Sequence, residues 1–124
     1  MTKNILGLRT AIYKVNDIAK AKLWYTKVFG TAPYFDEPFY VGFNIGGFEL
    51  GLQPDEGPIK DKGDHVVAYW GVDHVKETYD RFLDAGAKTF EPPQNVGGEI
   101  EVATVKDPWN NVIGLIFNPD FSIL

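Results

Sequence analysis

Residues 11–30, AIYKVNDIAKAKLWYTKVFG, decide the fold. This stretch begins inside the segment Ile5–Val15, whose β-branched and aromatic residues predict a strand. Asn16-Asp17 then offers side chains that cap a helix, and apolar residues recur at spacings of three or four between Ile18 and Val28. Gly30 follows as a residue that ends helices. The stretch therefore predicts a strand followed by an amphipathic helix that covers a sheet.

Three short strands are predicted after this helix. They are Tyr34–Phe35, Phe39–Ile45 and Phe48–Gln53, and Gly46-Gly47 between the last two is typical of a tight hairpin. Residues 54–64 hold two prolines, two glycines and several charged side chains, which indicates an exposed connector.

The same pattern then repeats in the second half of the chain. The sequence predicts a strand at His65–Val72 and a helix cap at Asp73. Val75–Leu83 then carry the apolar stripe of a helix that ends at Gly86, and two further strands flank a turn at residues 107–111. We therefore predict a single α+β domain that consists of two βαβββ modules with curved mixed sheets. The first module spans about residues 4–54, the second about residues 65–119, and a connector at about 54–64 joins them. Such halves pack together, or swap with a partner chain, around a concave ligand site.

Composition excludes several classes of function. The 124 residues carry a net charge of -5 without a basic cluster, which argues against a nucleic-acid binder. No apolar run is long enough to span a membrane and the N-terminus lacks the pattern of a signal peptide, so we expect a cytoplasmic protein. Since the chain has no cysteine, disulfides, thiolate metal sites and thiol nucleophiles are absent.

The segments AIYKVNDIAKAKLWYTKVFG and VKDPWNNVIGLIFNP resemble the vicinal oxygen chelate superfamily, which includes glyoxalases, bleomycin resistance proteins and extradiol dioxygenases. The resemblance spans nearly the whole chain and implies a homodimer that binds a small molecule. Asn110 stands where the family's hairpin glycine is usual, and asparagine tolerates the same left-handed conformation.

Enzymes of this family hold a divalent ion through His, Gln or Glu side chains, one on the first and one on the last strand of each half. The resemblance maps these positions onto Thr10, Gly51, Val67 and Gly114. None is a strong side-chain ligand, so we predict no metal cofactor.

Strand alternation nominates the residues that share a face with those positions. Glu49 alternates with Phe48 and Leu50, so its carboxylate points into a pocket or toward a dimer partner, whereas Glu101 either lines the pocket or lies on a solvated face. His65 is a base or metal ligand, or only rims the cavity, and an exposed Trp109 covers a pocket mouth or packs in a subunit interface. The predicted ligand-binding residues are Thr10, Glu49, Gln53, His65, Tyr69, Glu101 and Trp109.

Three functions are compatible with this pattern. The first is a bleomycin-resistance-like protein that binds a small molecule in a partly acidic, aromatic-lined pocket, for which the acid excess and the 15% aromatic content favour a cationic, flat or hydrophobic guest. The second is a glyoxalase-like lyase or extradiol-type dioxygenase with a displaced Zn, Ni, Mn or Fe site. The third is a metal-free isomerase that uses Glu49 or His65 as its base. We favour the first, because the four family positions lack ligands.

Overall fold

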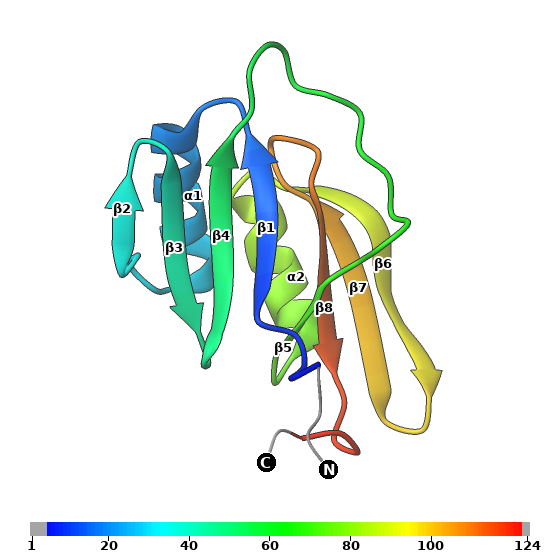
Figure 1. Cartoon of the computed structure of the whole chain (residues 1–124). Helices are drawn as coiled ribbons and strands as arrows, with labels where there is room; N and C mark the ends of the chain where they lie inside the picture. Colours follow the sequence, from blue (N-terminus) through cyan, green and yellow to red (C-terminus); the bar gives the residue numbers. More distant parts are fainter. Residues whose placement is uncertain (1–4, 123–124) are drawn as a thin grey trace. The chain divides into compact units, whose positions relative to one another are not determined.

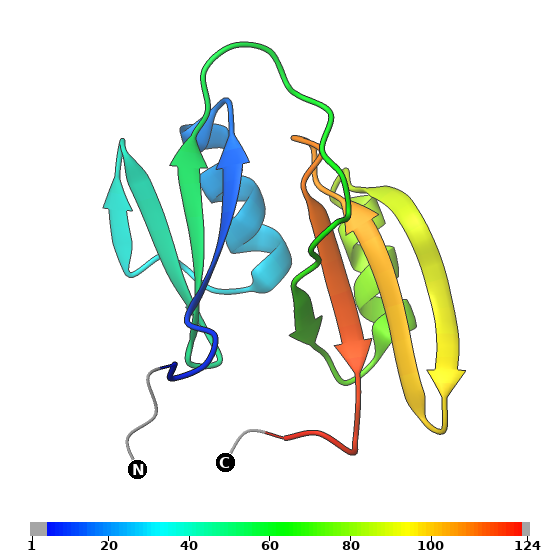
Figure 2. The same cartoon turned by 45° about the vertical axis from the view of Figure 1, so that its right-hand side comes forward.

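The structure is a computed structural model that describes residues 5–122. The chain forms two compact units, Met1–Gly57 and Pro58–Leu124, and each is described by itself. Each unit has the order βαβββ, as predicted from the sequence. In each, one helix lies against one face of a four-stranded mixed sheet (Figures 1 and 2).

The first unit has the sheet order β1-β4-β3-β2. Strand β1 is parallel to β4, and the other pairs are antiparallel. Its elements are β1 (Thr10–Val15), α1 (Ile18–Phe29), β2 (Phe35–Glu37), β3 (Tyr40–Ile45) and β4 (Phe48–Pro54).

Local sequence signals account for the boundaries of these elements. Asp17 caps α1 by accepting a hydrogen bond from the Lys20 amide at 3.1 Å, and Gly30 ends the helix with a φ of 67°. Gly46 and Gly47 both have positive φ values, 60° and 93°, which matches the tight turn between β3 and β4.

The core of the first unit lies between α1 and the sheet. Tyr25 of α1 and Phe43, Leu50 and Leu52 of the sheet are fully buried. Burying one such leucine side chain contributes about 1.5–3 kcal/mol. Because β4 is a central strand with Leu50 and Leu52 facing the helix, its intervening residues are fixed on the opposite face.

The second unit has the sheet order β5-β8-β7-β6, with β5 parallel to β8 and the other pairs antiparallel. The elements are β5 (Tyr69–Gly71), α2 (Val75–Asp84), β6 (Lys88–Gly97), β7 (Ile100–Lys106) and β8 (Val112–Phe117).

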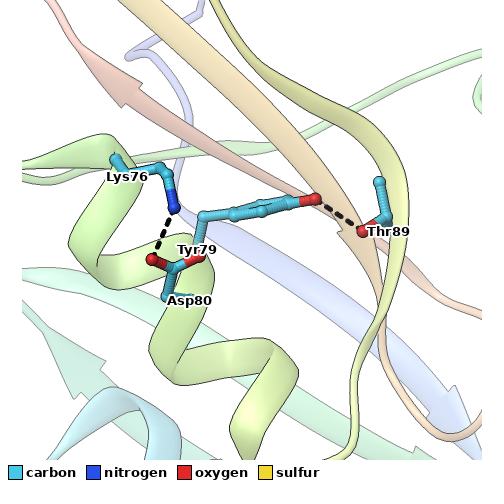
Figure 3. Close-up of polar contacts among 4 residues, drawn as sticks. All are labelled: Lys76, Tyr79, Asp80 and Thr89. Carbon is cyan, nitrogen blue, oxygen red and sulfur yellow. Dashed lines mark hydrogen bonds and ion pairs between the residues drawn. The ribbon is translucent and has the colours of Figure 1, made fainter.

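Tyr79 of α2 is buried, and its hydroxyl shares a 2.5 Å hydrogen bond with Thr89 of β6 (Figure 3). Lys76 and Asp80 form an ion pair on the exposed side of the same helix.

Several predicted boundaries were wrong. The first strand begins at Thr10 instead of Ile5, because the backbone turns at Gly7, where φ is 103°. The predicted strand His65–Val72 shortens to Tyr69–Gly71, since the chain bends at His65 and Val66.

Two further details of the second unit differ from the sequence pattern. His74, and not Asp73, is the residue before α2, and its side chain makes no capping hydrogen bond. Strand β6 runs through Pro92-Pro93, which an edge strand tolerates because one side of it needs no ladder hydrogen bonds. Its register with β7 shifts on both sides of Glu91.

The turn between β7 and β8 is held by Asp107. Its buried carboxylate accepts hydrogen bonds from the amides of Trp109 and Asn111 at 2.9 and 2.8 Å and from the Asn111 side chain at 2.9 Å. Asn110 adopts a φ of 67°, the left-handed conformation expected of it. Trp109 is only 4% exposed, so the expectation of an exposed indole at this turn was wrong. The turn folds the indole inward.

Candidate functional site

The face of the first sheet opposite α1 carries the candidate site, and we call it the open face. The register aligns Thr10 of β1 with Glu49 of β4, and Ile12 with Gly51. These residues alternate with the buried side chains that face α1, and in the described part of this unit no second helix or strand covers them. A carboxylate therefore lies on a sheet face that α1 does not cover.

Glu49 is the hydrogen-bond centre of the open face. The hydroxyls of Tyr34 and Tyr40 each donate to its Oε2 atom at 2.8 Å, and the Thr10 hydroxyl lies 3.4 Å from its Oε1 atom. Phenol to carboxylate hydrogen bonds are charge-assisted and stronger than bonds between neutral groups. The two tyrosines therefore hold the half-buried carboxylate in one position.

Two glycines make room for the tyrosine rings. Gly42 and Gly51 are register partners on the central strands β3 and β4. A Cβ atom at Gly42 would lie 3.2 Å from Cε1 of Tyr34, and one at Gly51 would lie 2.6 Å from Cζ of Tyr40. Any larger residue at Gly51 would displace the Tyr40 ring, so the glycine pair forms a floor on which the rings lie.

The carboxylate also changes the acidity of both phenols. Burial and the hydrogen bond to Glu49 raise the pKa of Tyr40 to about 12. The hydrogen bond to Glu49, aided by burial and by the negative charge, raises the pKa of Tyr34 as well. Both tyrosines therefore remain protonated donors at neutral pH, and the cluster of Glu49, Tyr34 and Tyr40 carries a single negative charge.

Within the described residues of the first unit, 5–57, no lysine or arginine forms an ion pair with Glu49. Arg9, the residue before β1, donates its guanidinium to the carbonyl oxygens of Leu6 and Leu8 at 3.0 and 3.3 Å. Lys14, the lysine that β1 carries on the open face, is the register partner of Gln53 and not of Glu49. The negative charge of the cluster is thus held by neutral donors alone.

Aromatic side chains continue from this cluster onto β2 and the turn after it. The ring of Phe35 lies 6.0 Å from that of Phe39 and 6.2 Å from that of Tyr40. Tyr34 and Phe39 are about two-thirds exposed, at 64% and 65%, although both are large apolar groups. The carboxylate is therefore bordered by accessible aromatic surface.

A related arrangement occurs on the second sheet. Tyr69, Gly114 and Thr104 are register partners across β5, β8 and β7, and the Thr104 hydroxyl donates to Glu91 at 3.2 Å. A Cβ atom at Gly114 would meet the Tyr69 ring at 2.5 Å. The duplicated units thus each place a tyrosine ring over a glycine and a threonine beside a glutamate.

The predicted site residues lie in different surroundings. Thr10 and Glu49 are in contact, and Gln53 lies on the same face four residues further along β4. Tyr69 lies on the corresponding face of the second sheet, whereas His65 is exposed in the bend before β5. Glu101 is exposed on β7 and shares its face with the buried Ala103 and Val105, opposite to Thr104. Trp109 is buried, as described above.

The sequence pattern did not indicate Tyr34, Tyr40, Glu91 or Thr104 as site residues. Their rings and hydroxyls reach neighbouring strands, and a period-two pattern does not show how far a long side chain extends. The available signal was the pair Gly42 and Gly51, because glycine inside a strand often marks a close approach of another group.

The residues at the four family metal positions do not fit a divalent ion. Gly51 and Gly114 have no side-chain donor and lie beneath tyrosine rings, Val67 is apolar, and the Thr10 hydroxyl is directed to Glu49. Elsewhere among residues 5–122, no group of three or more His, Asp or Glu side chains is placed to hold a metal ion.

A family model described as the Glyoxalase/Bleomycin resistance protein/Dioxygenase superfamily matches residues 7–115. No curated protein matches the chain. None of the helices in the described part has the length and apolar character needed to cross a membrane.

Solved structures share the fold at low sequence identity. A glyoxalase-related enzyme from Fulvimarina pelagi superposes with a TM-score of 0.78 at 18% identity, covering 97% of this chain and 94% of its own. The fosfomycin resistance protein FosX from Listeria monocytogenes gives 0.73 at 17% identity, with 96% and 97% covered. A glyoxalase/bleomycin resistance protein/dioxygenase family enzyme from Burkholderia phytofirmans gives 0.69 at 21% identity, with 90% and 98% covered.

Proposed function

The chain belongs to the glyoxalase/bleomycin resistance protein/dioxygenase superfamily, and from this premise we propose that it binds a small organic molecule on the open face of its first sheet, without a metal ion at the family's ligand positions. The observation that carries the proposal is the Glu49 carboxylate held by the hydroxyls of Tyr34 and Tyr40 over a floor of two glycines.

This arrangement has the properties of a preformed binding surface. A few fixed polar groups set among aromatic side chains are the usual composition of small-molecule sites. The two 2.8 Å hydrogen bonds fix the carboxylate before any ligand arrives, which lowers the ordering cost of binding. Stability alone does not require these groups to be exposed, since the core of the unit lies on the other side of the sheet.

The proposal that no metal ion is bound rests on the side chains that occupy the space of the family's metal ligands. At Gly51 and Gly114 the space beside the backbone is filled by the rings of Tyr40 and Tyr69. An imidazole or carboxylate introduced there would displace the ring. The sites are thus built for aromatic contact, and a metal-dependent lyase or dioxygenase would need ligands from elsewhere.

We also propose that the protein acts as a homodimer. The side chains of Ile5, Leu6 and Leu8 are between 71% and 84% exposed and directly precede the edge strand β1. Exposed apolar side chains beside a sheet edge favour association with a second copy. Sedimentation equilibrium should give the mass of a dimer, and replacing Leu6 and Leu8 by aspartate should shift it toward the monomer. A monomer in the unmodified protein would refute this part.

A fragment screen tests the proposed function. Protein stripped of metal with a chelator is screened by ligand-observed NMR against a library of cationic, neutral and anionic aromatic fragments. We expect hits that weaken in Glu49→Gln and persist in Glu77→Gln, a matched change on the exposed surface of α2.

Two outcomes of the screen would contradict the proposal. Hits of equal strength in wild type and Glu49→Gln would move the site away from the open face. Binding that occurs only after Zn, Ni, Mn or Fe is restored, with near-stoichiometric metal uptake, would establish the metal-dependent alternative.

A further inference from the structure

We infer that the ligand of the open face is a small organic cation, a protonated amine joined to an aromatic or alkyl body. This inference rests on the proposed function and names the chemical class of its ligand. The reasons are the charge of the Glu49 cluster, the free capacity of one carboxylate oxygen, and the aromatic surface beside it.

Charge is the first reason. The cluster of Glu49, Tyr34 and Tyr40 carries one negative charge, and within residues 5–57 no lysine or arginine forms an ion pair with it. Arg9, just before β1, donates to backbone carbonyl oxygens, and Lys14 on the open face lies beside Gln53, four residues beyond Glu49 along β4. An anionic ligand would be repelled, and a cation would gain an ion pair on a partly dehydrated surface, where such pairs are stronger than in bulk water.

The second reason is the uneven use of the two carboxylate oxygens. Oε2 accepts both 2.8 Å phenol hydrogen bonds, whereas Oε1 has only the Thr10 hydroxyl at 3.4 Å. A carboxylate oxygen has acceptor sites for about two hydrogen bonds. Oε1 therefore retains capacity for an N–H donor, and an ammonium group supplies both the donor and the opposite charge.

The aromatic side chains supply the third reason. Tyr34 and Phe39 are largely exposed, and Phe35 lies within ring-contact distance of Phe39 and Tyr40. Aromatic faces attract cations and also cover apolar groups. A ligand with its charge at Glu49 and an apolar body against these rings would use every feature of the face, whereas a simple metal ion or inorganic anion would not.

A charge series with one common body tests the inference. The probes are 2-naphthylmethylamine, 2-naphthylmethanol and 2-naphthoate, whose affinities are measured by isothermal titration calorimetry while amide NMR shifts locate the site. We expect the amine to bind about tenfold or more tightly than the alcohol, as one charge-assisted contact provides, and the naphthoate to bind more weakly still. The shifts should centre on Gly42 and Gly51.

Variants assign the preference to the carboxylate. In Glu49→Gln the amine and the alcohol should bind within about threefold of each other, while Glu77→Gln should keep the full preference. A Glu49→Gln spectrum whose amide shifts are unchanged away from Gly42 and Gly51 guards against a variant that merely folds poorly. Added salt should reduce the preference for the amine.

Each contrary outcome has a separate meaning. If the alcohol binds as tightly as the amine at Gly42 and Gly51, or if Glu49→Gln keeps the preference, the cation inference is overturned while the proposed function stands. If none of the three probes shifts these amides, the cation inference fails, and the proposed function fails with it when the fragment screen also finds no ligand there.

Discussion

Replacing Gly51 with alanine should destabilise the protein through Tyr40. A Cβ atom at this position would lie 2.6 Å from Cζ and 2.8 Å from Cε1 of the Tyr40 ring, distances that carbon atoms cannot keep. The ring must therefore move, and its 2.8 Å hydrogen bond to Glu49 breaks. The glycine has no positive φ, so alanine itself fits the local backbone.

The magnitude follows from two opposing terms. A hydrogen bond to a charged group contributes about 1.5–3 kcal/mol, and the lower part of this range suits a half-buried tyrosine. Replacing glycine with alanine restricts the unfolded chain and returns about 0.4–1 kcal/mol. The free energy of unfolding should therefore fall by about 1–2 kcal/mol in Gly51→Ala.

Urea denaturation of a double-mutant cycle with Tyr40→Ala measures this effect. Without the ring, Gly51→Ala should be neutral or slightly stabilising, so the two changes should couple by at least about 1 kcal/mol. Gly71→Ala is the control, because a Cβ atom there has no neighbour within 4 Å, and it should change stability by less than about 0.5 kcal/mol. Equal costs of Gly51→Ala with and without the Tyr40 ring would refute the glycine floor.

Three further predictions concern titration, the β7–β8 turn and the left-handed residue. Because the pKa of Tyr40 is raised from 10.0 to about 12, the contribution of this tyrosine to stability is present below pH 10 and is lost as the pH rises toward about 12. Tyrosinate absorbance should show the ionisation of Tyr40 as a late step in the titration. The Glu49→Gln change should move this step to lower pH. A late step that does not respond to Glu49→Gln would contradict the assignment. Asp107→Ala should lower the free energy of unfolding in urea denaturation by about 2–4 kcal/mol, because it removes three hydrogen bonds from a buried turn. A loss below about 1 kcal/mol would contradict this role of Asp107. Asn110→Gly should be nearly neutral and Asn110→Val should cost about 1–2 kcal/mol in the same assay, and equal effects would argue against the left-handed turn.

The fold was largely predictable because its signals are local and repeated. The helix-capping Asp17, the apolar spacing of α1 and the closing Gly30 identify one strand-helix unit, and the second half repeats the pattern. The predicted starts of two strands were wrong because the extent of a strand depends on the neighbouring strand with which it pairs. Residues 5–8 and 65–67 have strand-like composition, but a strand also needs a neighbour, and the backbone turns at Gly7 and bends at His65 before the pairing begins.

The candidate site was predictable only in part. Alternation with Leu50 and Leu52 indicates that Glu49 faces away from the helix, and the structure places it there. The two tyrosine partners of Glu49 were not predictable, because Tyr34 and Tyr40 reach it across the sheet from strand ends. Trp109 shows the opposite error, since a hairpin residue that looked exposed is turned inward by the hydrogen bonds of Asp107.

The measurement that tests the central claim most directly is the amide NMR spectrum of metal-stripped, isotope-labelled protein titrated with the strongest hit of the fragment screen. A ligand on the open face of the first sheet should produce its largest shifts at Gly42, Glu49 and Gly51, with no added metal and with saturation at one site. Shifts centred on the second sheet, or shifts that appear only after a divalent ion is added, would contradict the account.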